Sequence, residues 1–128
     1  MKKTDDNRSF KIKDRGKLGE LYVRKYLEQH GCTIVQMNYS SRWGEIDIIA
    51  ENDVRIIFVE VKTTAEGSPV SGFERITPSK LRKFTLTVQQ YLVSHPTDKQ
   101  PRIDCAQVTV SAKDNSLVKI DYLKNASS

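Results

Sequence analysis

The sequence predicts a single α/β domain in which a mixed central sheet is flanked by helices. The sheet is centred on the stretch from Arg42 to Lys62, where two apolar segments are joined by a tight polar turn, Glu51-Asn52-Asp53. A segment with helical spacing precedes this hairpin, and another follows it before two further β-rich segments. A chain of 128 residues is long enough for one such sheet with a few covering helices.

The first predicted helix begins at Arg15 and ends at Gly31, a residue type that commonly terminates helices. Residues 1–14 are polar and charge-mixed, so we expect them to form a flexible N-terminal arm. One domain then spans residues 15–124 and leaves residues 125–128 as a C-terminal tail. The apolar positions of the helix recur at helical spacing: Leu18, Leu21, Tyr22, Tyr26 and Leu27.

Glu20 lies off the centre of this apolar stripe, beside Gly19, where the helix could pack closely against another backbone. Two interpretations of Glu20 are open. It could be an ordinary solvated acid that forms an i,i+4 ion pair with Arg24. Alternatively, it belongs to the group of charged residues on the central hairpin that is described below.

The segments around the central hairpin are shorter and more polar. Residues 32–37, with the sequence CTIVQM, predict an edge strand, and residues 38–42 predict a polar turn into the hairpin. Residues 63–72 follow the hairpin and are rich in Thr, Ser, Gly and Pro without periodicity, which predicts a mobile loop.

The second predicted helix begins with Thr77-Pro78, a capping residue followed by proline at the first helical position, and ends before Pro96. One face of this helix is apolar: Leu81, Phe84, Val88, Tyr91 and Leu92. Two more predicted strands complete the sheet, at residues 102–110 and 117–123. The helix therefore serves as a crossover connection between two strands of one sheet.

Charged residues interrupt the apolar strands of the hairpin. Because side chains alternate along a strand, Glu45 and Asp47 share one face of the first strand, and Glu60 and Lys62 share one face of the second. The turn near Asn52 brings Asp47 diagonally across from Glu60. A carboxylate in so apolar a segment is costly unless a metal, a cation or hydrogen bonds compensate for it.

Two carboxylates that converge on one point make a hard-oxygen site that suits Mg²⁺ or Mn²⁺. Lys62 projects from the same face as Glu60, so its ammonium group can lie beside such a metal. Phosphodiester hydrolysis uses this set, because a metal polarises the phosphate and acidifies a bound water. We assign Lys62 to orientation and electrostatic stabilisation rather than to proton abstraction, since the nearby carboxylates should keep it charged.

The spacing of Asp47 and Glu60-Val61-Lys62 resembles the PD-(D/E)xK nuclease signature. More specifically, GEIDIIA and FVEVK, with a GKLGE helix before them and an ITPSK helix after them, resemble the bacterial YraN family (UPF0102). The resemblance covers residues 15–110. It implies a restriction-endonuclease-like core, similar to that of archaeal Holliday-junction resolvases, and a metal-dependent nuclease that acts on DNA, with branched or distorted DNA as candidate substrates.

The resemblance also implies roles for individual residues. Lys62 would be the catalytic lysine, Glu20 a helix acid that completes the site or serves a second metal, and Glu45 an accessory member. The implied catalytic residues are Asp47, Glu60, Lys62 and Glu20, and the implied metal site comprises Asp47, Glu60, Val61 and Glu20. The resemblance implies Lys80 as a nucleic-acid contact, and we predict Lys83, Arg42 and Lys17 as further contacts. Arg102-Ile103-Asp104 resembles a structural strand motif of the family.

Two positions depart from the family pattern. Thr64 and Ser40 stand where family members often carry basic side chains, which implies weaker phosphate contacts beside the site. A homodimer is compatible with the resemblance, although no stretch of the sequence stands out as a dimer interface.

The composition agrees with a nucleic-acid partner, since the net charge is +5 and the sequence pI is near 9.2. No run approaches the length of a membrane span, and the N-terminus lacks an apolar signal core, so we expect a cytoplasmic protein with no membrane partner. Cys32 and Cys105 do not have metal-ligand spacing.

Two other interpretations of the charged residues stay open. The chain could be a nucleic-acid-binding or adaptor module that keeps a nuclease fold with little or no turnover. Alternatively, Asp47, Glu60 and Lys62 could form a buried ion network that only holds the domain together, although such networks are expensive compared with apolar packing.

Overall fold

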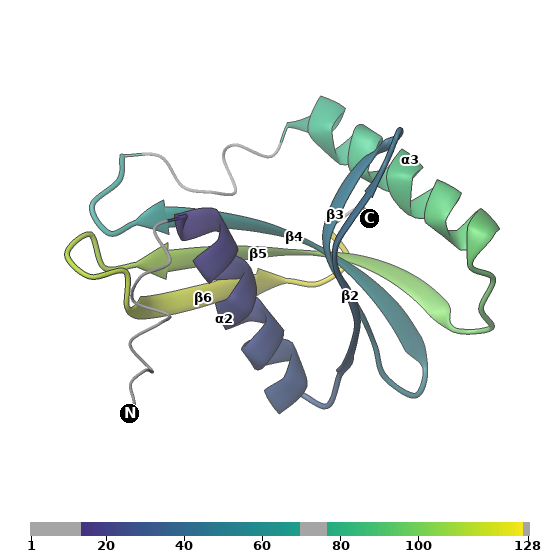
Figure 1. The fold of residues 1–128 in the computed structure, drawn as a ribbon, viewed down its shortest axis with the longest axis horizontal. Coiled ribbons are helices and arrows are strands. Elements are labelled where there is room, and N and C mark those ends of the chain that lie inside the picture. Colours follow the sequence, from purple (N-terminus) through teal and green to yellow (C-terminus); the bar gives the residue numbers. More distant parts are fainter. Residues whose placement is uncertain (1–13, 70–76, 127–128) are drawn as a thin grey trace.

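The computed structural model describes residues 14–69 and 77–126. Most of the predicted N-terminal arm and the last two residues of the predicted tail lie outside this part of the chain. The elements, shown in Figure 1, are α2 (Arg15–Gln29), β2 (Thr33–Ser41), β3 (Gly44–Glu51), β4 (Arg55–Ala65), α3 (Pro78–Ser94), β5 (Gln100–Val110) and β6 (Leu117–Leu123). None of the helices in the described ranges is long and apolar enough to cross a membrane.

The strands form one mixed sheet in the order β2-β3-β4-β5-β6. Neighbouring strands are antiparallel except for β4 and β5, which are parallel and are connected through α3. A parallel pair needs such a crossover, because its second strand must start at the same end of the sheet as the first. The prediction of an α/β fold with a mixed sheet flanked by helices is confirmed, and the architecture is consistent with a restriction-endonuclease-like core.

The two helices cover opposite faces of the sheet (Figure 1). On the α2 face, Val23 and Leu27 pack against strand residues such as Val59 and Val108. On the α3 face, a second apolar cluster comprises Ile46, Ile49, Ile56, Phe58, Phe84, Val88, Tyr91 and Ile103. Coverage of both faces explains why residues 56–59 are all apolar and all buried.

The apolar face of α2 differs in part from the prediction. Leu21 is 44% exposed, whereas Val23, which the prediction left out, is fully buried. The pattern Leu18, Val23, Leu27 follows the side of the helix that meets the sheet. Leu21 is apolar by type, but it lies beside this contact rather than in it, and helical spacing alone does not show which side of a broad stripe faces the core.

The boundaries of two strands were also predicted too short. Residues 38–41, expected to be a turn, belong to β2, where Tyr39 pairs with Ile46 and Ser41 pairs with Gly44. Asn38 adopts a φ of 55°, so this residue does fit a turn conformation, yet the strand continues through it. The predicted loop at 63–72 likewise begins later, because Thr63–Ala65 extend β4 along β5.

The predicted second helix is confirmed at both ends. The Thr77 side chain accepts a hydrogen bond from the N–H of Lys80, and Pro78 occupies the first helical position. The helix ends at Ser94, ahead of Pro96.

A buried polar network fastens the C-terminal strands to the sheet. Asp104 is completely buried and accepts hydrogen bonds from the Arg102 guanidinium at 2.9 and 3.0 Å, from the Tyr122 hydroxyl at 2.6 Å and from the Asn125 N–H at 3.1 Å. The carboxylate is therefore well satisfied, as a buried charge must be. The prediction that Arg102-Ile103-Asp104 is structural agrees with this network.

Candidate functional site

The candidate site lies where β3 separates from β4. Their pairing runs from Glu51↔Ile56 to Ile48↔Val59, and one further step would place Asp47 directly opposite Glu60 rather than diagonally across from it. Beyond Ile48 a side chain replaces the main-chain ladder, because a carboxylate oxygen of Asp47 accepts the N–H of Val61 at 2.8 Å. In a strand the N–H and C=O of one residue point toward the same neighbour, so the carbonyl of Val61 faces this gap too.

The side-chain direction changes within β3 at the point of separation. Ile46 packs in the α3 cluster, whereas Ile48, two residues later, packs in the α2 cluster on the opposite face. A regular strand would put these two side chains on the same face. The start of β3 is also held close to α3, since a Cβ on Gly44 would lie 2.7 Å from Oγ1 of Thr87, and Gly44 has a φ of +147°.

The second strand contributes an acid and a base to the same face. Nζ of Lys62 lies 3.1 Å from Oε2 of Glu60, and the two side chains are 27% and 23% exposed. The pair is therefore open to solvent rather than sealed in the core. The prediction that Glu60 and Lys62 project from one face of β4 is confirmed.

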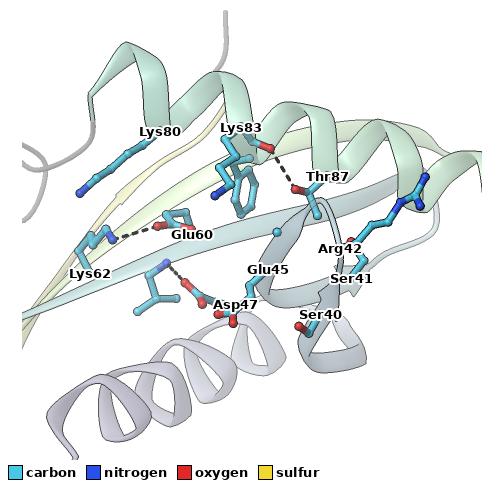
Figure 2. A pocket seen from close by; sticks show the side chains of 13 residues that line it. Ser40, Ser41, Arg42, Glu45, Asp47, Glu60, Lys62, Lys80, Lys83 and Thr87 are labelled. Atoms are coloured by element: carbon cyan, nitrogen blue, oxygen red, sulfur yellow. Dashed lines mark hydrogen bonds and ion pairs between the residues drawn. The ribbon is translucent and has the colours of Figure 1, made fainter.

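These side chains form the floor of an open cleft with a volume of about 490 Å³. Figure 2 shows the lysines of α3 above the Glu60–Lys62 pair, with Asp47 and Glu45 on the neighbouring strand. Carboxylates thus come from the strands, and ammonium groups come from both the helix and β4. The cleft is lined by Ser40, Ser41, Arg42, Gly44, Glu45, Asp47, Glu60, Val61, Lys62, Lys80, Lys83, Phe84 and Thr87.

The carboxyl group of Asp47 is held in an environment that disfavours its charge. Burial is the largest cause, the charge of Glu60 adds to it, and together they raise the pKa of Asp47 from 3.8 to about 7. The N–H of Val61 and the ammonium of Lys62 act in the opposite direction but do not offset the rise. Carboxyl groups with raised pKa values are common in the clefts of functional sites.

Glu20 approaches the same group of acids from α2. One of its carboxylate oxygens, Oε1, is buried without a hydrogen-bond partner, while the side chain has a hydrogen bond with Asn38. Burial raises the pKa of Glu20, and the charge of Glu20 in turn helps to raise the pKa of Asp47. The interpretation of Glu20 as a solvated acid paired with Arg24 is wrong, because Arg24 pairs with Glu28 at 3.5 Å.

Close packing of α2 on β4 explains the position of Glu20. A Cβ on Gly19 would lie 1.9 Å from Oγ1 of Thr63, so only glycine permits this approach. The expected close approach at Gly19 is confirmed, although its nearest neighbour is a side chain rather than a backbone. Glu20 does not line the cleft, and it influences Asp47 through its charge from the other face of the sheet.

The donors present fit a hard divalent cation. Asp47 and Glu60 offer carboxylate oxygens and Val61 a carbonyl oxygen, which are ligands that Mg²⁺ and Mn²⁺ prefer. The raised pKa of Asp47 and the unpartnered oxygen of Glu20 both indicate uncompensated negative charge at this place. Among residues 14–69 and 77–126, however, no three acidic, His or Cys side chains are close enough to hold a metal by themselves. A cation here would therefore keep several waters.

The residues predicted to contact nucleic acid divide into two groups. Arg42, Lys80 and Lys83 line the cleft, whereas Lys17 does not and lies exposed on α2. Position 64, where members of the resembled family often carry a basic residue, also lies outside the cleft lining. Thr64 is buried and accepts a hydrogen bond from the Gln107 amide at 2.8 Å.

Several lining residues were not predicted, notably Ser41, Gly44 and Thr87. Thr87 is completely buried, and its hydroxyl donates to the Lys83 carbonyl at 3.0 Å. Its position in the sequence contained a signal, since it is a polar residue four positions after Lys83, on the side of the helix that faces the sheet.

Comparisons with known proteins give one consistent result. The model of the uncharacterised protein family UPF0102 matches residues 19–108. A UPF0102 protein of Dichelobacter nodosus is 38% identical over 126 residues, which cover 98% of each chain. A UPF0102 protein of Chlorobium phaeobacteroides is 35% identical over 84% of this chain and 88% of its own, and one of Porphyromonas gingivalis is 34% identical over 88% and 83%.

Proposed function

The chain belongs to the uncharacterised protein family UPF0102, and we propose that it is a metal-dependent nuclease that hydrolyses phosphodiester bonds of DNA, with branched or distorted DNA as candidate substrates. The observation that carries the proposal is the convergence of Asp47, Glu60 and Lys62 in one open, polar cleft. The spacing of these three residues also matches the PD-(D/E)xK nuclease signature, and the fold is consistent with a restriction-endonuclease-like core.

The charge distribution of the cleft supports a polyanionic substrate. Lys80 and Lys83 extend from α3 over the acidic floor, and Arg42 lies on the β2–β3 hairpin (Figure 2). Basic side chains on a wall can contact phosphates without reading sequence. The acids below them would repel a bare phosphate, so the arrangement suits a phosphate accompanied by a divalent cation.

Each residue has a distinct role in this proposal. Asp47, Glu60 and the carbonyl of Val61 would hold Mg²⁺ or Mn²⁺, which when bound supplies a Lewis acid and an acidified water. Asp47 is oriented by the N–H of Val61 at 2.8 Å. Lys62, 3.1 Å from Glu60, would stabilise the negative charge that develops on the scissile phosphate. Glu20 would adjust the charge of the site from α2.

Cleavage assays test the proposal directly. We expect cleavage of plasmid and four-way junction DNA in Mn²⁺ or Mg²⁺, and a loss of about 10²–10³-fold or more in Lys62→Ala. Asp47→Ala should abolish cleavage. Lys119→Ala is a matched control, since Lys119 is a 62% exposed lysine on β6, paired with Asp121 and outside the cleft. Equal cleavage by wild type, Asp47→Ala and Lys62→Ala would identify a contaminant and refute the proposal.

A second function is a nucleic-acid-binding or adaptor module with little or no turnover. The observation that favours it is that no three-ligand metal cluster is present in the described ranges, while Lys62 is engaged by Glu60. This alternative predicts salt-dependent DNA binding that survives Asp47→Ala, with no cleavage in any divalent metal. If DNA binding is absent even at low salt, both functions are excluded.

A homodimer is part of the nuclease proposal. Cutting both strands of a junction or duplex at once requires two sites, and two copies of the chain would provide two clefts. Light scattering of the protein with and without junction DNA tests this, and a strictly monomeric enzyme that still cuts both strands at once would exclude it.

A further inference from the structure

The tip of the β2–β3 hairpin carries Trp43, the single tryptophan of the chain. Ser41 ends β2 and Gly44 begins β3, so Arg42 and Trp43 form the connecting turn. Trp43 is half-buried. Arg42 and Gly44, the residues on either side of it, both line the cleft. The turn that carries the indole therefore borders the candidate site.

Neither the turn nor the core accounts for this tryptophan. Two-residue hairpin turns favour Asn, Asp and Gly, because their central residues commonly need a positive φ. Here Gly44 carries the positive φ, at +147°, and Arg42 and Trp43 are not among the positive-φ residues. Trp43 also belongs to neither of the two apolar clusters that stabilise the sheet. Neither of the two apolar clusters therefore accounts for its large ring.

The setting of the ring is that of a stacking surface. The guanidinium carbon of Arg42 lies 4.9 Å from the centroid of the Trp43 ring, so a cation already covers part of the indole. An aromatic ring beside a cation is the combination that single-stranded nucleic-acid sites use, where a base stacks on the ring and the cation lies near phosphate. Lys80 and Lys83 continue the line of positive charge along the same cleft.

We propose that Trp43 stacks on an unpaired or terminal nucleotide base and thereby selects DNA with single-stranded, forked or branched structure over continuous duplex. Both faces of a base inside a duplex are covered by its neighbours, so only an unstacked base can offer a face to the indole. This inference rests on the proposed function, because it assumes that the cleft binds DNA. It adds the feature that is recognised, an unstacked base, and the residue that recognises it.

Intrinsic fluorescence reports on this one residue, since no other tryptophan contributes. The protein is titrated in EDTA, which prevents metal-dependent cleavage, with a forked DNA that has unpaired arms and with a long duplex of matched sequence. Fluorescein anisotropy of the same DNAs measures binding independently. We expect the forked DNA to quench the Trp43 emission and the duplex to leave it nearly unchanged. Trp43→Ala should reduce the preference for the fork by about tenfold, and Trp43→Phe should retain most of it.

A displaced tryptophan provides the control. Val54 is 61% exposed in the turn at the opposite end of β3, so the emission of a Trp43→Phe/Val54→Trp variant should not respond to the fork. If anisotropy shows fork binding while the wild-type emission stays constant, the stacking inference is wrong and the proposed function stands. A fork preference that persists in a folded Trp43→Ala variant also overturns it. If anisotropy shows no binding of either DNA in EDTA, and none to the Lys62→Ala variant in Mg²⁺, the proposed function fails together with the inference.

Discussion

Replacement of Asp47 by asparagine should stabilise the protein at high pH. The carboxyl group has a pKa of about 7 in the folded state against 3.8 for an unperturbed aspartate. Between pH 3.8 and about pH 7 the carboxyl group is protonated in the folded state but ionised in the unfolded state. The free energy of unfolding therefore falls as the pH rises from 3.8 to about 7, and the whole loss is present above this range. The pKa difference corresponds to a deficit of about 4 kcal/mol. An asparagine is never ionised, and its amide oxygen can still accept the N–H of Val61.

Urea denaturation of wild type and Asp47→Asn in EDTA measures this effect. At pH 8 we expect the variant to be more stable by up to about 4 kcal/mol, a shift of about 2 M in the urea midpoint for a chain of this size. At pH 5 the gain should shrink to under about 2 kcal/mol, because the wild-type carboxyl is then protonated in the folded state. Asp121→Asn, at a 49% exposed acid on β6, serves as the control and should show little difference at either pH.

Divalent metal extends the same experiment to the site. At pH 8, Mg²⁺ or Mn²⁺ should raise the urea midpoint of wild type and leave that of Asp47→Asn unchanged, because a ligand stabilises only the state that binds it. If Asp47→Asn is instead less stable than wild type at pH 8, the carboxylate holds the fold together. The interpretation of Asp47, Glu60 and Lys62 as a structural ion network would then replace that of a functional site.

Three further substitutions separate fold from site. Asp104→Ala removes the acceptor of a buried hydrogen-bond network and should lower the free energy of unfolding, measured with urea, by about 3–5 kcal/mol. The protein that stays folded should still bind metal when this is measured by calorimetry. Gly44→Ala should lower the stability of the fold more than Gly31→Ala does. Both residues have a positive φ, but only at Gly44 would the added Cβ meet a neighbour, Thr87. Equal urea midpoints for the two variants would show that the hairpin is free to move away from α3. Glu20→Gln should raise the free energy of unfolding at pH 8 but not at pH 4. Burial disfavours the ionised form of this acid and raises its pKa, so the penalty is present only at high pH. A loss of stability at pH 8 would contradict this reasoning.

Much of the fold could be predicted because its signals are local. The Thr77-Pro78 start of α3 depends on a cap and a ring that act within one turn of helix. The β3–β4 hairpin follows from two apolar runs and the short turn between them, where the Asn52 side chain accepts the N–H groups of Val54 and Arg55. That hairpin register in turn places Asp47 beside Glu60, so the central pair of acids was predictable from the same pattern.

The features that could not be predicted depend on tertiary contacts. The sequence predicted a close approach at Gly19, but it did not show that Thr63 of β4 is the neighbour or that the approach buries Glu20. The choice of Val23 over Leu21 as a core residue depends on the angle at which the helix crosses the sheet. The extension of β2 through Asn38 depends on its pairing with β3 rather than on its own composition.

The interruption of the sheet explains how one fold can hold so many charges at its centre. In an intact ladder the Asp47 side chain would stand perpendicular to the sheet and could not reach a main-chain N–H of β4. Ile46 and Ile48 pack on opposite faces of the sheet, and the Asp47 carboxylate between them accepts the Val61 N–H in place of a ladder bond. Glu20 can then act on Asp47 from one face while Glu60 acts from the other. A substitution that restored regular pairing would satisfy the backbone at the expense of the acidic site, so the separation of the two strands is itself a requirement of the proposed chemistry.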